Sequence, residues 1–256
     1  MKIVVTYQWA LDPQEASVAA DGKVDFSRAK AVVSDYDAVA IEVARGLATA
    51  AGATLVGVSV GGAAAAQAVA TKAALSRGLD EALVVADADN AGTLNTAAVI
   101  AAAVQSLGDV ALVVTGDASL DSGSKMLAAT LGGTLGWATI TDALGVAFDG
   151  STLTAERVLP EGVQKVALAA PAVVAVASDA AKAKAPGMKD ILAAGKKPVT
   201  VKSTADLGVA LASEGTVTAT AKLSGPARQQ IAIDTKDPAA AAAQLVSALR
   251  AAGVLD

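Results

Sequence analysis

The chain of 256 residues contains no cysteine and no histidine, and aromatic residues make up only 2% of it. Without cysteine the chain cannot hold an iron–sulfur cluster, form a disulfide or use a thiol nucleophile. Without histidine it lacks a common ligand of zinc and haem, and the base of a Ser-His-Asp triad. The few aromatic side chains leave little that could stack on a planar redox ring. We therefore expect no enzyme active site and no metal site made by this chain alone.

Charge and hydropathy exclude two further classes of partner. The formal net charge is −5 at pH 7, so no basic footprint for nucleic acid or for anionic membranes is present. No uninterrupted apolar run reaches the roughly 18 residues that a membrane-spanning helix needs, so we expect no membrane insertion. Met1-Lys2 leads directly into Ile3-Val4-Val5, which is too short for the apolar core of a signal peptide. The sequence therefore predicts a buried first strand and a cytoplasmic protein.

The first half of the chain alternates between strand patterns and helix patterns, and glycines mark most of the ends. This alternation is typical of a parallel sheet covered by helices on both faces, so the sequence predicts a Rossmann-like α/β fold. The predicted strands are Lys2–Tyr7, Leu55–Val60, Glu81–Val85 and Val110–Thr115; the predicted helices run from Ser34–Asp37 to Gly52, over Ala63–Arg77, from about Thr93 to Leu107 and from near Lys125.

The pattern changes after Trp137, where short alternating runs are separated by Asp149-Gly150 and Glu161-Gly162. Such dipeptides between apolar runs are a hairpin signal. We therefore expect antiparallel hairpin strands to extend the parallel sheet, and a further strand at 172–177 to complete a core domain of residues 1–177.

The remainder, residues 178–256, has weak core-forming potential. It carries five scattered lysines between 182 and 197 and a last helix, with Asp237 as N-cap, Pro238 in the first position and Gly253 past the end. A long tail of this kind needs a surface to lie on. We expect a docking loop and a C-terminal arm that pack on a partner subunit.

In an open parallel sheet, ligands bind at the carboxyl ends of the strands, where the strand order reverses. The first and fourth predicted strands should be neighbours at that point. The loop from Gly116 to Ser124 is rich in glycine and serine and opens a helix, so its N–H groups could bind an anion; the alternative is an ordinary strand–helix turn. Neither a G-x-G-x-x-G nor a P-loop motif is present. The carboxylate pairs are interpreted as helix caps and solvated groups: Asp35 with Asp37, and Asp117 with Asp121.

Several segments, in order along most of the chain, resemble the β subunit of electron-transfer flavoproteins. No one of them is decisive, but their order and spacing together are specific. They are Met1–Val5 with Asp12; Ala73–Ala82; Asp109-Val110 with Val114–Gly116; Glu156-Arg157, Glu161-Gly162 and Leu168–Val174; and Met188 to Val199 with Asp206–Val209.

The resemblance implies a heterodimer in which an α subunit holds the redox-active FAD. Electrons would pass from flavin dehydrogenases, such as the acyl-CoA dehydrogenases of fatty acid oxidation, to an acceptor such as a quinone reductase, without chemistry by this chain. The alternative is a stand-alone adenine-nucleotide-binding module of the stress-protein type, which shares an α/β layout. That alternative explains neither the hairpins after Trp137 nor the long tail.

The resemblance also implies a buried nucleotide in this chain, either AMP or, in a bifurcating branch, a second FAD. By position its contacts would be Thr6, Ser34, Val60 and the loop from Gly116 through Ser122, Gly123 and Ser124. The chain departs from the family here. Ser34 replaces an asparagine, Gln8 replaces a lysine, and a shorter loop offers fewer N–H donors.

A docking role for Met188 is likewise implied by the resemblance, because the family places a leucine on a projecting loop at this position. Pro186-Gly187 would make the turn, and Ile191 and Leu192 would anchor the helix behind it. The alternative is that Met188 is a core residue of a short helix.

Overall fold

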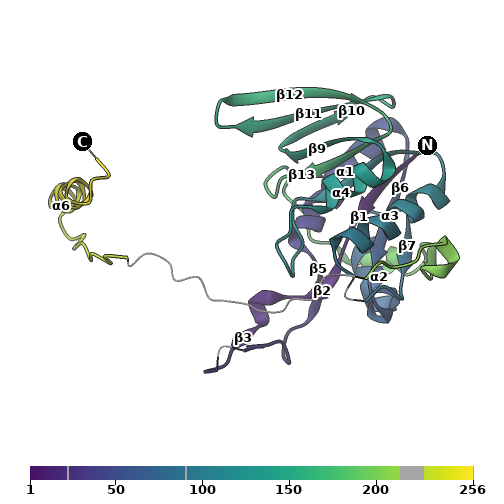
Figure 1. Ribbon diagram of the computed structural model, residues 1–256, viewed down its shortest axis with the longest axis horizontal. Helices are drawn as coiled ribbons and strands as arrows, with labels where there is room; N and C mark the ends of the chain where they lie inside the picture. The colour runs from purple at the N-terminus through teal and green to yellow at the C-terminus, as the bar shows by residue number, and fades with distance from the viewer. Residues whose placement is uncertain (22, 90, 214–227, 256) are drawn as a thin grey trace. The chain divides into compact units, whose positions relative to one another are not determined.

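The computed structural model describes residues 1–21, 23–89, 91–213 and 228–255. They fall into a first unit, Met1–Glu214, and a second unit, Gly215–Asp256. The first unit is built around a seven-stranded sheet in which every pairing is parallel (Figure 1). In spatial order its strands are β14 (Val199–Lys202), β7 (Glu81–Val85), β6 (Thr54–Val60), β1 (Lys2–Thr6), β8 (Val110–Gly116), β13 (Ala172–Val176) and β9 (Ala138–Ala143).

Helices cover both faces of this sheet. Buried residues of α1 (Asp35–Ala51) and α2 (Ala68–Leu75) share one core with Ile3 and Val5 of β1. Buried residues of α3 (Thr93–Leu107) and α4 (Leu127–Leu135) share the other core with Val4. Successive side chains of a strand point to opposite faces, so β1 contributes to both cores. The Rossmann-like α/β class predicted from the sequence is confirmed.

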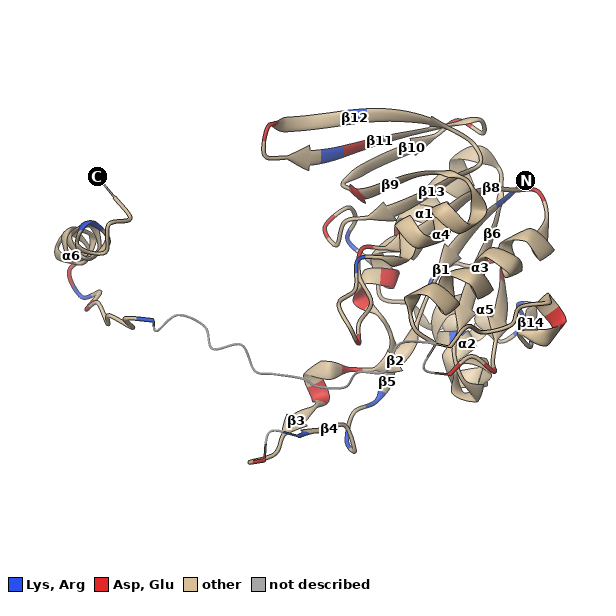
Figure 2. Ribbon diagram, in the orientation of Figure 1, with Lys and Arg blue, Asp and Glu red and all other residues tan. Residues whose placement is uncertain are grey.

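The parallel strands are nearly free of charged residues. Lys2, Glu81, Asp142 and Lys202 are the charged residues of the seven strands, and each lies at or next to a strand end. Figure 2 shows these strands mostly in tan, the colour of uncharged residues. Strands buried on both faces read as continuous apolar runs rather than as alternating ones. This is why five of them, β1, β6, β7, β8 and β13, were recognisable from sequence alone.

One predicted element differs in the structure, and the sheet contains strands that were not predicted. The helix expected over Ala63–Arg77 is a 3-10 turn, Ala63–Ala66, followed by Gln67 in an extended conformation and then by α2. The strand β9 was not predicted. Its sequence, Ala-Thr-Ile-Thr-Asp-Ala, has a single large apolar residue and so gives little strand signal. The segment is a strand because it pairs with β13.

The antiparallel strands form a sheet of their own. They are β10 (Gly145–Phe148), β11 (Thr152–Leu159) and β12 (Gly162–Ala169). Within the described residues none of them pairs with the parallel sheet, which corrects the expectation that they would extend it. They join the fold by packing instead, because Phe148 and Leu153 are buried in the core that contains α1. Two shorter ladders pair β2 (Trp9–Leu11) with β5 (Ala31–Val33), and β3 (Ser17–Val18) with β4 (Val24–Asp25).

Residues after 177 continue the first unit. The short helix α5 (Met188–Ala194) buries Ala194 next to α2, and β14 then pairs with β7 at the edge of the sheet. Lys197, between them, donates from Nζ to the carbonyl oxygens of Leu75 (3.1 Å) and Leu79 (2.5 Å). The compact unit therefore extends past the boundary that we expected at residue 177. Whether any of this segment docks on a partner stays a prediction.

The second unit contains α6 (Pro238–Ala251). The carboxylate of Asp237 accepts from the N–H groups of Ala239 (3.0 Å) and Ala240 (3.3 Å). Pro238 occupies the first turn, and Gly253, past the end, has φ of +69°. The cap, the proline and the terminal glycine predicted from the sequence are thus all in place.

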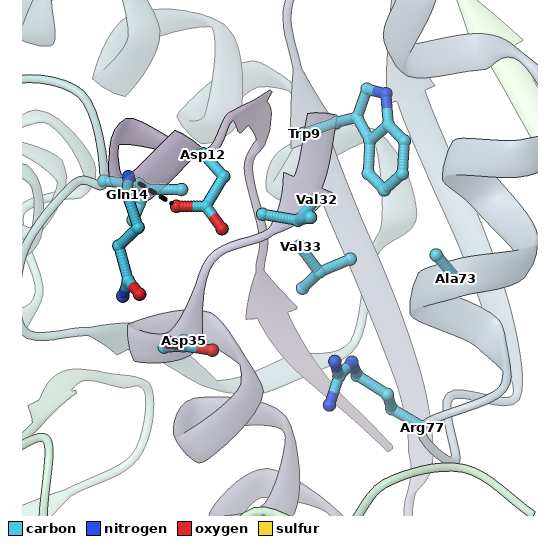
Figure 3. A pocket seen from close by; sticks show the side chains of 9 residues that line it. Trp9, Asp12, Gln14, Val32, Val33, Asp35, Ala73 and Arg77 are labelled. Carbon is cyan, nitrogen blue, oxygen red and sulfur yellow. Dashed lines mark hydrogen bonds between the residues drawn. The ribbon is translucent and has the colours of Figure 1, made fainter. Parts of the chain in front are cut away.

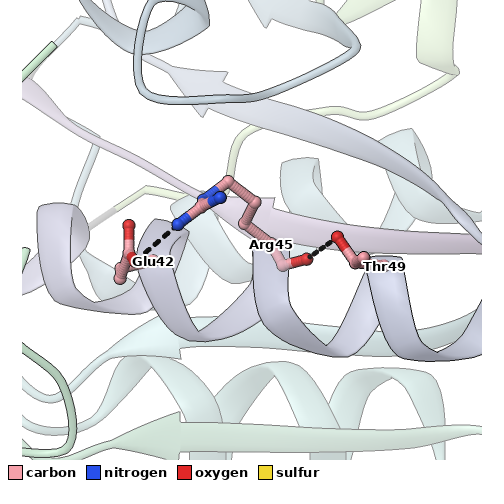
Figure 4. Close-up of polar contacts among 3 residues, drawn as sticks. All are labelled: Glu42, Arg45 and Thr49. Carbon is pink, nitrogen blue, oxygen red and sulfur yellow. Dashed lines mark hydrogen bonds and ion pairs between the residues drawn. The ribbon is translucent and has the colours of Figure 1, made fainter. Parts of the chain in front are cut away.

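The outer surface of α1 is polar. Arg45 Nη2 forms an ion pair with Glu42 Oε1 at 2.6 Å, and the hydroxyl of Thr49 donates to the carbonyl oxygen of Arg45 at 2.8 Å (Figure 4). The pair is partly buried, and helix pairs at this spacing add only a few tenths of a kcal/mol, roughly; the buried face of the helix holds it on the sheet. Among the described residues, no helix combines the length and the apolar character needed to cross a membrane.

Candidate functional site

The strand order reverses between β1 and β8. From β1 the chain crosses to β6 and then β7 on one side, whereas β8, β13 and β9 lie on the other side. The expected pairing of the first and fourth predicted strands is therefore confirmed. Thr6 ends β1, Val60 ends β6 and Gly116 ends β8, which places three predicted nucleotide contacts at the same carboxyl edge of the sheet.

Ser34 comes to the same place from the helix side. It is the N-cap of α1, but its side chain makes no capping hydrogen bond, and its buried Oγ has no partner among the described residues. The first turn of α1 lies directly against the end of β8. A Cβ on Gly116 would stand 2.9 Å from the carbonyl carbon of Tyr36 and 2.9 Å from Asp37 Oδ1. Glycine is required at 116 because the helix approaches so closely, not because a ligand does.

Asp37 is the unexpected residue of the site. The sequence suggested a capping or solvated carboxylate, but Asp37 is buried, and burial raises its pKa from 3.8 to about 7. A hydrogen bond of 2.7 Å, donated by the backbone N–H of Gln8 to Oδ2, offsets part of that rise. Helical spacing was the available signal, because Asp37 stands four residues before Ile41 and seven before Ala44, both buried.

The loop after β8 is tied to the end of β1 by Gln8, which was not predicted as a site residue. Gln8 Nε2 donates to Asp121 Oδ2 at 2.8 Å, and the N–H of Leu120 donates to Gln8 Oε1 at 3.3 Å. Ser122 N–H donates to Asp121 Oδ1 at 2.6 Å. Burial raises the pKa of Asp121, but the hydrogen bonds from Gln8, Ser122 and Ser119 outweigh it and hold that pKa below its ordinary value.

Further donors of the loop are also engaged. Gly123, at φ +64°, donates its N–H to the carbonyl oxygen of Ser119 at 3.0 Å. Ser124 N–H donates to Ser119 Oγ at 3.3 Å, and the Oγ atoms of Ser119 and Ser122 lie 2.6 Å apart. Lys125, the cation of the loop, forms an ion pair of 2.6 Å with Asp117.

A nucleotide phosphate therefore does not fit the loop as it stands. Ser122, Gly123 and Ser124 were predicted to cradle it, yet their N–H groups already have acceptors within the loop. Asp121, whose hydrogen bonds favour its charged form, would repel a further anion in the loop. The orphaned Ser34 Oγ opens into no cavity, because Ser34 is fully enclosed.

A pocket of about 300 Å³ lies beside the switch point (Figure 3). Figure 3 shows the guanidinium of Arg77 and the side chain of Asp35 on one side, with Trp9 and Val32 facing them. Burial lowers the pKa of Arg77, and the charge of Asp35 partly opposes this effect. The lining includes none of Thr6, Ser34, Val60 and Gly116; it consists of Trp9, Asp12, Gln14, Val32, Val33, Asp35, Ala73, Arg77 and Leu120.

Met188 lies on another element, at the start of α5 next to α2, and no described contact joins it to the switch point. Its side chain is 72% exposed, so the alternative of a core residue is wrong. Ile191 and Leu192 are 47% and 68% exposed and do not anchor the helix; the small Ala194 does. The three large apolar side chains of α5 thus form an exposed apolar face, Met188, Ile191 and Leu192.

The described residues thus combine a nucleotide-binding-like α/β fold, a switch point whose loop donors are engaged by the chain itself, and an exposed apolar face on α5. The family model described as the electron transfer flavoprotein domain matches residues 21–207. The match spans well over half of the chain, which therefore belongs to the electron transfer flavoprotein family. The resemblance found in the sequence is confirmed at this level, and with it an electron-transfer-flavoprotein type of role.

Proposed function

We propose that the chain is the β subunit of a heterodimeric electron-transfer flavoprotein. In this proposal a separate α subunit holds FAD, and this chain braces it without catalytic residues of its own. Electrons arrive from flavin dehydrogenases, such as acyl-CoA dehydrogenases, and leave to an acceptor such as a quinone reductase. The proposal includes the cytoplasmic location expected from the sequence.

The observation that carries the proposal is α6, a helix that buries none of its residues. It has a sound N-cap and an apolar sequence that includes Leu245 and Val246. Helices in proteins gain most of their stability from packing an apolar face. A helix that finds no such packing in its own unit supports a partner chain as its surface.

The exposed face of α5 supports a second contact, separate from the first. Flexible methionine side chains suit pockets of varied shape, so Met188 is the residue that we propose enters a pocket on the dehydrogenase. The stand-alone nucleotide-binding module is the weaker alternative, because it gives no role to either exposed helix. The AMP or second FAD expected in this chain is not part of the proposal, since the loop donors are already engaged.

The test begins with the reading frame next to the one that encodes this chain. If that frame encodes an FAD-binding protein, the two chains are co-expressed and separated by size-exclusion chromatography, with flavin absorbance recorded. We expect an equimolar complex whose flavin bleaches when an acyl-CoA dehydrogenase and its substrate are added. A chain that elutes alone, or that retains flavin by itself, would contradict the proposal.

A further inference from the structure

The loop after β8 contains a carboxylate, that of Asp121, to which neighbouring groups donate hydrogen bonds. The carboxylate of Asp121 accepts hydrogen bonds from the backbone N–H of Ser122 at 2.6 Å and from Gln8 Nε2 at 2.8 Å. A loop N–H and a side-chain amide are the kinds of donor that hold a phosphate at the carboxyl edge of an α/β sheet. Here they are directed at a group that the chain itself supplies.

The backbone of Gln8 is held by Asp37. Its backbone N–H donates to the buried Asp37 at 2.7 Å, and its side chain spans the gap between the end of β1 and the loop. One amide atom donates to Asp121 and the other accepts from the N–H of Leu120 at 3.3 Å. Both hydrogen-bonding ends of the amide are thus used on the loop, and Gln8 acts as a clamp.

The charge balance of the site opposes a second anion. Asp37 lies at the start of α1, where no cation of the described residues forms an ion pair with it, and its charged form is disfavoured by burial. Asp121 lies in the loop, and Lys125 is engaged by Asp117 at 2.6 Å and by Asp142 at 3.6 Å. A phosphate entering here would meet the carboxylate of Asp121, and that of Asp37 wherever it is ionised, and would gain no unengaged cation from the described loop.

We infer that Asp121, clamped by Gln8, occupies the anion position at the switch point and excludes a nucleotide phosphate from this chain. The inference concerns this chain alone and does not depend on the proposed partner. It predicts that the nucleotide position of this family member is filled by protein.

The experiment uses the full chain and two measurements. The first measurement looks for a nucleotide in two ways. Chromatography of the supernatant after acid denaturation detects any nucleotide that the chain releases. Titration of the native chain with AMP and with inorganic phosphate is monitored by the amide NMR signals of Leu120, Ser122, Gly123 and Ser124. We expect less than about a tenth of a nucleotide released per chain and no shift of these signals at millimolar AMP or phosphate, concentrations at which a weak site of about 1 mM would be half filled. One AMP or flavin released per chain, or saturable shifts, would overturn the inference.

The second measurement tests the clamp. Gln8→Ala removes the acceptor of the Leu120 N–H and a donor to Asp121, so hydrogen exchange at Leu120 should accelerate about tenfold or more and the pKa of Asp121 should rise. Gln14→Ala is the matched control. Gln14 is an exposed glutamine that lines the pocket of about 300 Å³ together with Leu120, and its side chain takes no part in the clamp. This variant should change neither the exchange rate of Leu120 nor the pKa of Asp121. If Gln8→Ala also leaves both unchanged in a chain that is still folded by circular dichroism, Gln8 is not a clamp and the inference fails.

Discussion

At the scale of single residues, Asp37 is a buried carboxyl whose charged form is disfavoured in the folded chain. Its pKa rises from 3.8 to about 7 because the carboxyl is removed from water. The folded chain therefore binds a proton that the unfolded chain has released between these two values. This contribution to stability is present in full below pH 3.8 and is lost as pH rises through about 7, a difference of roughly 4 kcal/mol.

Replacing Asp37 with asparagine should remove this dependence. Asparagine keeps the size and can still accept the N–H of Gln8, as the protonated acid does. We expect the variant to match the native chain near pH 4.5 and to exceed it by roughly 2–4 kcal/mol at pH 8. Urea unfolding between pH 4.5 and 8.5 measures this directly, and the absence of histidine removes the side chain that usually titrates in this range.

The control is Asp35→Asn, which changes an exposed carboxylate in the same helical turn. It should lose at most about 1 kcal/mol through the helix dipole, with no trend between pH 5 and 8. Parallel pH curves for the native chain and Asp37→Asn would show that Asp37 is ionised and solvated in the folded chain.

The residues of the switch point were predictable in part. Thr6, Val60 and Gly116 come together because parallel strands end at a common edge, a property of the fold class. The clamp was not predictable, because Gln8 and Asp121 are far apart in the sequence and meet only through the conformation of one loop. Asp37 was missed because aspartate in a first helical turn is usually a solvated cap.

At the scale of elements, α5 combines a packed residue and an exposed apolar face within seven residues. It is fixed from behind by Ala194 and by Lys197, whose Nζ bonds to the carbonyl oxygens of Leu75 and Leu79. Its large apolar side chains, by contrast, face outward. The sequence predicted the helix and the role of Met188, but it assigned the anchoring to Ile191 and Leu192 because large apolar residues usually face a core.

Met188→Ala should therefore leave the fold intact and weaken docking. We expect the melting temperature, the partner and the flavin to be retained, while the affinity for the dehydrogenase falls by roughly 2 kcal/mol, about thirtyfold. Steady-state reduction of the carrier at varied dehydrogenase concentration measures this. Leu94→Ala, which truncates another exposed apolar residue at the start of α3, is the control and should be neutral. An earlier melt with unchanged turnover in Met188→Ala would refute the docking role.

The strand β14 was not predicted from the sequence. Val-Thr-Val-Lys is β-branched, which favours a strand, but it is only four residues long and directly follows Lys196-Lys197-Pro198, which was interpreted as a turn. It becomes a strand because β7 offers it an open edge, with Val199 paired to Ala82 and Lys202 to Val85. Pairing over so long a sequence separation leaves no local signal.

At the scale of the whole molecule, the two units differ in what they bury. The first unit contains both cores and the seven-stranded sheet, and the second contributes α6 without burying any of its residues. The alternation of strands and helices predicted the first unit well, since it depends on apolar runs that local sequence records. The extent of the unit was underestimated because edge elements owe their structure to their neighbours.

Ending the chain at residue 214 should separate stability from assembly. Because no residue of α6 is buried, we expect the shortened chain to unfold cooperatively within about 2 °C of the full chain. It should no longer co-purify with the FAD-binding partner. Calorimetry and pull-down from a co-expression lysate give the two results. Retention of the partner by the shortened chain at native strength would show that the arm is not the assembly element.

The position of β14 also has a consequence for how the protein is made. The strands β1, β6 and β7 leave the ribosome early and can pair as they emerge, since amino-terminal parts of a chain fold first during synthesis. The outer edge of β7 has to wait for β14, which is the last strand of the sheet to be translated. An open apolar strand edge is a template for pairing with other chains. The speed of translation between β7 and β14 therefore sets how long each nascent chain carries that hazard.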